Sequence, residues 1–323
     1  MKNIFITRKI DEVGIKMLQD KGYSVDINTN ETIPTQDEII NFLTQKNYDA
    51  VVTLLTDKID AKVFDAVPYT KMYANFASGF DNLDIAEAKK RGIAVSNAPA
   101  PITSEAVAEH TLALMLALSA SIVEADQYVR DGKYTGWSPT NFIGTDVLGK
   151  TLGLVGVGRI GGRVGFYAKA LGMKVLYHDV ARNEQSEKEC GAEFCESLDD
   201  LLKKSDIVSI HVPLLESTRH LINWEKLNLM KKTSFLINTS RGPVVDEVSL
   251  TKALSEGVIA GAGLDVFEFE PKISPDLIKL QNVILTPHIA SASVEARRQM
   301  SEIVAKNVID FLEDREPQNK VNK

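Results

Sequence analysis

The chain of 323 residues has a formal net charge of −7, and 44% of its residues are hydrophobic and 25% charged. This composition is that of an ordinary globular protein, and the length favours two domains, each with its own core. The negative charge and the lack of a Lys/Arg cluster exclude a basic surface for nucleic acid or for an anionic membrane. The two cysteines, Cys190 and Cys195, fit neither a disulfide framework nor a metal site, so we expect free thiols in a reducing compartment.

The N-terminus enters a predicted strand directly and shows no signal-peptide core. The longest apolar run, residues 111–123, is too short and too polar at its edges to span a bilayer. We therefore expect a cytoplasmic protein without a membrane partner.

The first hundred residues alternate short β-rich runs with stretches in which apolar residues recur three and four apart. Such alternation predicts a parallel sheet with helices on both faces. The predicted strands are 4–6, 24–27, 50–53, 72–75 and 94–96, and the predicted helices are 11–21, 36–45, 60–66 and 83–91.

Two prolines within residues 97–101 predict a hinge between domains. Residues 103–126 then have the pattern of one long helix, with Thr103 or Ser104 as its N-cap. Ala, Leu and Met occupy most faces of this helix, so it must be covered on several sides. We expect that a second copy of the chain covers it, in a homodimer, although burial within one monomer satisfies the same pattern.

A glycine-rich turn follows the predicted strand 151–155 and precedes a helix predicted at 163–171. Gly156 permits the sharp bend from strand to helix, Gly158 lets the backbone approach a pyrophosphate, and Gly161 lets helix and strand pack closely. The free N–H groups at the start of the helix face the phosphates. The turn thus predicts a dinucleotide site.

A second strand, 174–178, ends at Asp179, about 20 residues after the glycines, where this fold places an acid against the adenosine ribose. Further strands are predicted at 207–211, 234–238, 261–265 and 283–286, which gives six strands in a doubly wound dinucleotide-binding domain. Residues 295–312 are predicted to form a last helix that returns to the first domain, followed by a charged tail. The predicted domains are therefore 1–100 with 291–323, and 101–290.

Ligands of open α/β sheets bind beyond the carboxyl ends of the strands. Arg241 follows the strand 234–238, Glu268 and Glu270 follow the strand 261–265, and His288 follows the strand 283–286. Each of these residues alone is more often structural than catalytic. Their occurrence after three successive strands predicts that they meet at one edge of the sheet.

Those three residue types suit the reduction of a 2-oxo acid, in which the carbonyl oxygen must gain a proton. A histidine has an ordinary pKa near 6.5, and a neighbouring carboxylate favours its protonated form. The planar guanidinium of arginine matches a substrate carboxylate with two hydrogen bonds. We therefore interpret His288 as the acid/base, Glu270 as its orienting partner and Arg241 as the substrate clamp. The other histidines are interpreted as structural or cofactor-lining: His110, His178, His211 and His220.

Several segments of the chain resemble the D-isomer-specific 2-hydroxyacid dehydrogenases, and the likeness extends along essentially the whole length. The segments that carry it are GVGRIG at 156–161, HVPL at 211–214, NTSRG at 238–242, GLDVF at 263–267 and TPHIA at 286–290.

The resemblance implies an α/β fold with two doubly wound parallel-sheet domains, a flavodoxin-like substrate domain and a Rossmann dinucleotide-binding domain. It implies that Arg241, Glu270 and His288 are catalytic, and that Asp265 contacts the cofactor carboxamide. The cofactor-binding residues that it implies are Gly156, Gly158, Arg159, Ile160, Gly161, Asp179, His211, Val212, Pro213, Thr239, Ser240, Asp265 and Ala290. The substrate-binding residues are Leu55, Ser78, Gly79, Arg241 and His288, with backbone N–H groups of the 77–82 loop meeting the substrate carboxylate.

Within the family the chain looks most like glyoxylate/hydroxypyruvate reductases, through residues 52–55, 79–84 and 137–142. NADP-using members commonly have a small residue and an arginine where this chain has His178 and Asp179. A carboxylate there repels a 2′-phosphate, which favours NAD. Arg182, three residues further on, leaves NADP open.

Other small 2-oxo acids remain alternatives, because a pocket discriminates one methylene by only about 1–3 kcal/mol. A D-lactate or branched-chain 2-oxo acid reductase and a short phosphoglycerate dehydrogenase fit the same motifs. A formate dehydrogenase does not, because that family pairs the histidine with glutamine rather than with an acid. In a different class, an NAD-sensing binding protein would keep this scaffold without turnover.

Overall fold

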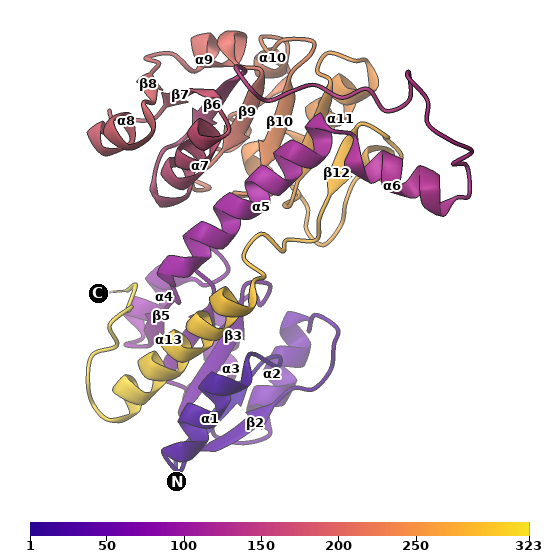
Figure 1. Ribbon diagram of the computed structural model, residues 1–323. Coiled ribbons are helices and arrows are strands. Elements are labelled where there is room, and N and C mark those ends of the chain that lie inside the picture. The colour runs from indigo at the N-terminus through magenta and orange to yellow at the C-terminus, as the bar shows by residue number, and fades with distance from the viewer. Residues whose placement is uncertain (323) are drawn as a thin grey trace. The chain divides into compact units, whose positions relative to one another are not determined.

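The computed structural model describes residues 1–322 and divides the chain into two compact units, each built around its own sheet (Figure 1). The first unit contains Met1–Thr103 and Ala292–Lys323, and the second contains Ser104–Ser291. The sequence placed these divisions at 100/101 and 290/291.

The first unit contains a five-stranded parallel sheet with helices on both faces. Its elements are β1 (Asn3–Ile6), α1 (Glu12–Asp20), β2 (Ser24–Ile27), α2 (Gln36–Thr44), β3 (Ala50–Leu54), α3 (Ala61–Ala66), β4 (Met72–Phe76), α4 (Ile85–Lys90), β5 (Ala94–Ser96) and α13 (Val294–Leu312). The strand order β2-β1-β3-β4-β5 is the flavodoxin-like order.

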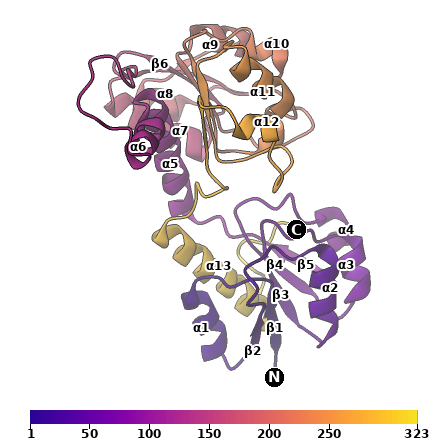
Figure 2. The same cartoon turned by 90° about the vertical axis from the view of Figure 1, so that its right-hand side faces the viewer.

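Alternate residues of each strand in this unit enter two separate cores, because successive side chains of a strand point to opposite faces. Ile4 and Ile6 pack with α1 and α13, whereas Phe5 between them packs with α2 and α3. Figure 2 shows α1 and α13 on one face of the sheet and α2, α3 and α4 on the other. The predicted doubly wound fold is confirmed for this unit.

The charged tail that the sequence predicted after α13 is docked on the first unit. The buried Asn322 accepts the Val95 N–H at 3.0 Å and donates to the Ile93 carbonyl at 2.6 Å, and the Val321 N–H donates to the Val95 carbonyl at 2.9 Å. The chain end thereby pairs with β5, an edge strand whose outer hydrogen-bonding groups would otherwise lack partners.

The second unit contains a seven-stranded parallel sheet in the order β12-β11-β10-β9-β6-β7-β8. Its elements are α5 (Pro101–Ser119, which begins in the first unit), α6 (Ile122–Arg130), β6 (Thr151–Val155), α7 (Arg159–Ala170), β7 (Lys174–His178), α8 (Glu184–Cys190), β8 (Glu193–Phe194), α9 (Leu198–Lys204), β9 (Ile207–Ile210), α10 (Trp224–Leu227), β10 (Phe235–Asn238), the 3-10 helix η1 (Gly242–Val244), α11 (Glu247–Ser255), β11 (Gly261–Leu264), α12 (Pro275–Ile278) and β12 (Val283–Leu285).

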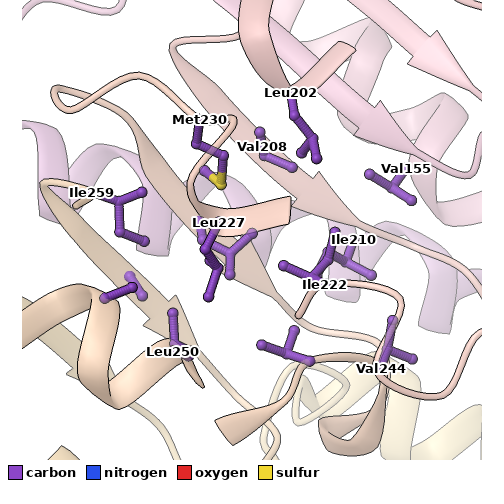
Figure 3. Close-up of a cluster of buried hydrophobic side chains, with 14 of the residues drawn as sticks. Val155, Leu202, Val208, Ile210, Ile222, Leu227, Met230, Val244, Leu250 and Ile259 are labelled. Atoms are coloured by element: carbon purple, nitrogen blue, oxygen red, sulfur yellow. The ribbon is translucent and has the colours of Figure 1, made fainter. Parts of the chain in front are cut away.

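This order is that of a Rossmann dinucleotide-binding fold, as predicted, extended by one strand. The sequence predicted six strands and missed β8, whose two residues are too few to show the alternation of apolar and polar residues that marks a strand. On one face of the sheet, Val208 and Ile210 of β9 pack with Leu227 of α10 and Leu250 of α11 (Figure 3). Because this core is fully buried, it fixes the strand ends from which the functional loops emerge.

The prediction of one helix over residues 103–126 is wrong, because the structure has two helices bent by 66°. The Thr145 N–H donates to the Ser119 carbonyl at 2.8 Å, so this carbonyl bonds to a distant segment. Ser121 then adopts a left-handed φ of 52°, and α6 starts anew. The first helix begins at Pro101, because proline fits the first helical position, where its missing N–H has no partner to lose. Among the described residues no single helix is long and apolar enough to cross a membrane, and α5 and α6 meet that criterion only as a bent pair.

Candidate active site

The loops that follow β10, β11 and β12 lie side by side, because these strands are neighbours with aligned ends. Asn238 pairs with Leu264, and Leu264 pairs with Leu285. The three loops carry Arg241, Glu270 and His288 respectively. Parallel pairing thus places all three at one edge of the second unit's sheet.

His288 and Glu270 form a hydrogen-bonded pair, with 2.9 Å between the imidazole Nδ1 and the carboxylate Oε2. The other carboxylate oxygen, Oε1, accepts the Phe267 N–H at 2.9 Å. A carboxylate only accepts, so Nδ1 carries the proton of the pair and Nε2 is left for proton exchange. The side chains of His288 and Glu270 are 25% and 33% exposed, so solvent reaches the pair.

Glu270 is held in its ionised form. Burial opposes ionisation, but the hydrogen bond to His288, the charge of that imidazole, the Phe267 N–H and the charge of Arg241 together lower the pKa of Glu270. The carboxylate therefore orients the ring of His288 through the hydrogen bond at Nδ1.

Arg241 lies close enough for its charge to act on Glu270, and its Nη1 donates to the Ser240 carbonyl at 2.8 Å. The next residue, Gly242, packs directly against the backbone of Phe267 and Glu268, and a Cβ at Gly242 would overlap the Phe267 carbonyl. The loop of Arg241 is therefore packed on the loop of Glu270, which fixes the spacing of the guanidinium and the carboxylate.

Asp265 has a role that the sequence reasoning missed. Its buried carboxylate accepts hydrogen bonds from Thr286 Oγ1 at 2.6 Å and from the backbone N–H groups of Ile289 and Ala290, both at 2.8 Å. Its carbonyl accepts the His288 N–H at 2.9 Å. Asp265 thus closes the turn in which His288 adopts a left-handed φ of 55°.

Two other histidines, His110 and His211, make contacts within the second unit. His110 of α5 has Nε2 at 3.1 Å from Thr286 Oγ1 and at 3.6 Å from Asp265 Oδ1, so it supports the same turn. His211 has Nε2 at 2.9 Å from Ser209 Oγ, and burial lowers the pKa of His211 to about 3. The imidazole of His211 is therefore neutral at physiological pH.

The glycine-rich turn has the geometry of a phosphate cradle. Gly156 has a φ of 93°, and a Cβ at Gly161 would overlap the Gly156 carbonyl, so neither position tolerates a side chain without strain. A Cβ at Gly158 would meet no atom within 4 Å, which leaves open space beside the backbone. The helix α7 starts at Arg159, earlier than the predicted residue 163, so the N–H groups of Arg159, Ile160 and Gly161 belong to its first turn. These features fit the pyrophosphate of a dinucleotide.

Asp179 lies at the end of β7, beside this turn. Its carboxylate accepts the Val157 N–H at 2.9 Å and the Val180 N–H at 2.7 Å. Arg182 makes two hydrogen bonds to Glu187, at 3.1 and 3.0 Å, which raise the pKa of the guanidinium further. The acid at the ribose position is thus fixed in place, and the nearby arginine is already bound to a carboxylate.

The remaining predicted cofactor residues lie at the same edge of the sheet. Gly156 packs against the His211 carbonyl and the Val212 side chain, each 3.0 Å from the position of its missing Cβ, and Pro213 follows them. Thr239 Oγ1 lies 2.8 Å from Thr111 Oγ1 of α5, and Ser240 Oγ donates to Asn238 Oδ1 at 2.9 Å.

Three predicted substrate residues belong to the first unit, where they also follow neighbouring strands. Asn75 Nδ2 donates to the Gly79 carbonyl at 2.9 Å, and Asn97 Nδ2 donates to the Ser78 carbonyl at 2.7 Å. Leu55 directly follows β3, the neighbour of β4. The amide side chains therefore hold the loop of Ser78 and Gly79 at the carboxyl edge of this sheet.

Comparison with known proteins decides the family. Residues 112–290 match the model of the D-isomer specific 2-hydroxyacid dehydrogenase, NAD binding domain. The chain belongs to this family. It is therefore an NAD(P)-dependent oxidoreductase that interconverts 2-oxo acids and 2-hydroxy acids, which confirms the predicted family, cofactor class and reaction.

Relatives within the family resemble the chain along nearly its whole length. The glyoxylate reductase of Korarchaeum cryptofilum is 50% identical over 322 residues, which are 99% of this chain and 95% of that protein. The glyoxylate reductase of Thermococcus litoralis is 48% identical over 99% of this chain and 96% of its own length.

Solved structures agree with this assignment. A protein from Thermus thermophilus matches with a TM-score of 0.92 and 38% identity over 99% of both chains. D-Lactate dehydrogenase from Aquifex aeolicus, complexed with NAD and lactic acid, has a TM-score of 0.84 and 32% identity over 100% of this chain and 99% of its own. An NADPH-dependent glyoxylate/hydroxypyruvate reductase from Sinorhizobium meliloti, in complex with NADP and malonate, has a TM-score of 0.84 and 30% identity over 99% of this chain and 96% of its own.

Proposed function

We propose that this protein reduces a small 2-oxo acid, glyoxylate or hydroxypyruvate, to the corresponding 2-hydroxy acid (the D isomer where the product is chiral), with His288 as the proton donor. The observation that carries the mechanism is the 2.9 Å pair of His288 and Glu270 beside Arg241. Relatives named glyoxylate reductase, at 50% and 48% identity, support the choice of substrate.

The residues divide the chemistry of reduction among them. A nicotinamide dinucleotide held by the glycine-rich turn and Asp179 would supply the hydride for the carbonyl carbon. His288 holds a proton on Nε2 for the carbonyl oxygen, which would otherwise develop into an unstable alkoxide. Arg241 binds the carboxylate of the substrate through two parallel hydrogen bonds. Glu270 keeps the imidazole in the required tautomer, and solvent restores the proton because the pair is partly exposed.

We assign the second unit as the dinucleotide-binding domain and the first as the substrate-binding domain. In the first unit, Leu55 and the backbone N–H groups of Ser78 and Gly79 contribute to recognition of the 2-oxo acid. The loop is suited to that task, since Asn75 and Asn97 bind its carbonyls and leave its N–H groups for a ligand.

The proposed cofactor is NAD rather than NADP. Asp179 places a negative charge where a 2′-phosphate would lie, and Glu187 holds Arg182, three residues further along the chain. Both features oppose a phosphate at this position. We also propose a cytoplasmic location, because Cys190 and Cys195 are free and buried, as expected in a reducing compartment.

We further propose a homodimer. Exposed apolar side chains lie close together in sequence on α6 and on the irregular segment that follows it, and one of them, Trp137, is 85% exposed. Concentrated apolar exposure of this kind marks an interaction surface rather than a solvated one. The residues of this apolar arm are Ile122, Val123, Val129, Tyr134, Trp137, Ile143 and Leu148.

The proposed activity is tested by following NADH and NADPH oxidation with a panel of 2-oxo acids. The panel contains glyoxylate, hydroxypyruvate, pyruvate, a branched-chain 2-oxo acid and phosphohydroxypyruvate. We expect the highest kcat/KM with glyoxylate or hydroxypyruvate and with NADH. Preference for pyruvate or a branched-chain acid would replace the substrate assignment, and absence of turnover with every acid would leave an NAD-sensing protein.

A further inference from the structure

Two buried glutamates near the active site take no part in the chemistry described above. Glu247 is the first residue of α11 and is 5% exposed, and Glu268 follows β11 with a side chain that is 7% exposed. Ionised carboxylates are costly to bury unless hydrogen bonds satisfy them. Their presence therefore calls for a physical reason.

The two glutamates bind one another's backbone. Glu247 Oε2 accepts the Glu268 N–H at 3.0 Å, and Glu268 Oε2 accepts the Glu247 N–H at 3.0 Å. Glu247 Oε1 accepts the Ser274 N–H at 2.9 Å, and Glu268 Oε1 lies 2.6 Å from His220 Nε2. We call Glu247, Glu268 and these four bonds the glutamate latch.

The N-terminus of α11 explains how both carboxylates are tolerated. The Glu247 N–H belongs to the first turn of the helix, where backbone N–H groups lack partners within the helix. The positive end of the helix dipole favours the two carboxylates there. His220 and the N-cap residue Asp246 are the other titratable groups beside the latch.

The latch binds the loop of Glu270 on both sides of that residue. One hydrogen bond to Glu247 comes from the N–H of Glu268, two residues before Glu270, and the other comes from the N–H of Ser274, four residues after it. Between these two contacts, Phe269 is exposed, the Lys272 N–H donates to the Phe269 carbonyl at 2.9 Å, and Ile273 packs against the core of the second unit. The first of the two contacts also adjoins Phe267, whose N–H binds Glu270 and whose carbonyl packs on Gly242.

We propose that the glutamate latch is a positioning device that holds Glu270 against His288 and keeps the Glu270 loop seated on the Arg241 loop. This inference rests on the roles proposed above for Glu270 and His288. The four bonds of the latch go to three backbone N–H groups and to His220, so Glu247 and Glu268 act on Glu270 through the loop.

The first test is Glu247→Gln, which keeps the shape of the side chain but leaves one acceptor oxygen for two backbone N–H groups. We expect kcat for 2-oxo acid reduction to fall by about 10-fold to 100-fold, as for a misplaced catalytic group, with the Kd for NADH unchanged. The acid-side fall of kcat should begin at higher pH, because a loosened Glu270 loses the hydrogen bond that lowers its pKa. The matched control is Glu256→Gln, an exposed glutamate just after the same helix, which should behave as wild type.

A spectroscopic signature follows the same pair without turnover. The Nδ1 proton of His288, hydrogen-bonded to a carboxylate, should give a proton resonance downfield of the amides, identified by its loss in His288→Ala. We expect this resonance to disappear or broaden in Glu247→Gln and to persist in Glu256→Gln. A latch that only stabilised the fold would lower the Tm and leave the resonance in place.

Ser274 offers a second, backbone-level test that does not depend on folding of the glutamate variant. Its φ of −53° is the value that proline adopts, so Ser274→Pro removes the N–H at a compatible φ, whereas Ser274→Ala retains the N–H. We expect Ser274→Pro to reproduce the losses of Glu247→Gln and Ser274→Ala to show none. Folded latch variants with wild-type kcat, pH profile and imidazole resonance would overturn the inference. A wild-type enzyme inactive with every 2-oxo acid would instead refute the proposed function, and the resonance would still decide on the latch.

Discussion

His288 is held from two directions at once. Glu270 binds its ring at Nδ1, while Asp265 closes the turn that gives its backbone a left-handed conformation. Because both the ring and the backbone are fixed before a substrate arrives, little ordering remains to be done during the reaction. The protein thus fixes the imidazole of His288, which is the proposed proton donor, before the substrate binds.

Replacing this imidazole tests the assignment most directly. We expect His288→Ala to lower kcat by about 10²- to 10⁴-fold, the usual contribution of a positioned acid or base. The Kd for NADH, measured by fluorescence titration, should stay the same because the glycine-rich turn is untouched. A variant with an unchanged kcat would remove His288 from the mechanism.

Glu270 should also make stability depend on pH. Burial opposes its ionisation, but the contacts with His288, the Phe267 N–H and the charge of Arg241 together outweigh burial, so the folded pKa of Glu270 lies below its unfolded value of about 4.3. Such a carboxyl stabilises the native state above the unfolded pKa, and this stabilisation is lost as pH falls through the folded pKa. Urea unfolding should therefore show a larger loss of unfolding free energy for Glu270→Gln at about pH 7 than at about pH 3. Equal losses at both pH values would contradict the shift.

At the scale of elements, the active site is a contact between loops of neighbouring strands. The loop after β10 packs on the loop after β11 at Gly242, with no room for a side chain. This contact and the bonds between Glu247 and Glu268 join the two loops that carry Arg241 and Glu270.

A methyl group at this contact should separate the two loops. In Gly242→Ala the new Cβ would overlap the Phe267 carbonyl, so one loop must shift. We expect kcat/KM for the 2-oxo acid to fall by about 100-fold, as for a displacement of about 1 Å, while NADH still binds. A variant with wild-type kcat/KM would show that the loops adjust without moving the catalytic groups.

The docked chain end is a second element whose contribution can be measured. Asn322→Ala would leave the Val95 N–H and the Ile93 carbonyl without their buried partner. We expect the free energy of unfolding to fall by about 1–3 kcal/mol in urea titrations. The control Glu316→Ala, at an exposed position nearby, should change it by less than about 1 kcal/mol. A negligible loss for Asn322→Ala would mean that the chain end contributes little to the first unit.

At the scale of the whole molecule, the chain contains two doubly wound units, each with loops at the carboxyl edge of a parallel sheet. The apolar arm that follows the bend after Ser119 is a surface that these loops do not explain. Its exposure in one copy supports the proposed homodimer.

Negative charges introduced on the apolar arm should dissociate the proposed homodimer. We expect Ile122→Glu with Val129→Glu to convert a dimer into a monomer in sedimentation experiments, because both side chains are exposed on α6 and tolerate substitution in the monomer. Val294→Glu, at an exposed apolar position of α13, should leave the dimer intact. A wild-type protein that sediments as a monomer at all concentrations would refute the proposed assembly.

The features that the sequence predicted correctly depend on neighbouring residues. The spacing of apolar residues along the chain located the principal strands, and the glycine-rich turn with Asp179 predicted the dinucleotide fold. The order of strands then placed Arg241, Glu270 and His288 at three neighbouring strand ends, where the structure has them. Their catalytic roles remain predictions.

Other features needed the folded chain, because their partners are far apart in sequence. The bend after Ser119 follows from a hydrogen bond to Thr145, the chain end is docked by Asn322, and β8 is too short to have a period. The sequence pointed to Asp265 as a cofactor contact but not to its role in the turn of His288, and it gave no signal for Glu247, since each carboxylate binds backbone N–H groups more than twenty residues away. Local patterns determine which segments become strands and helices, whereas only the packed sheet decides which buried carboxylate meets which N–H group.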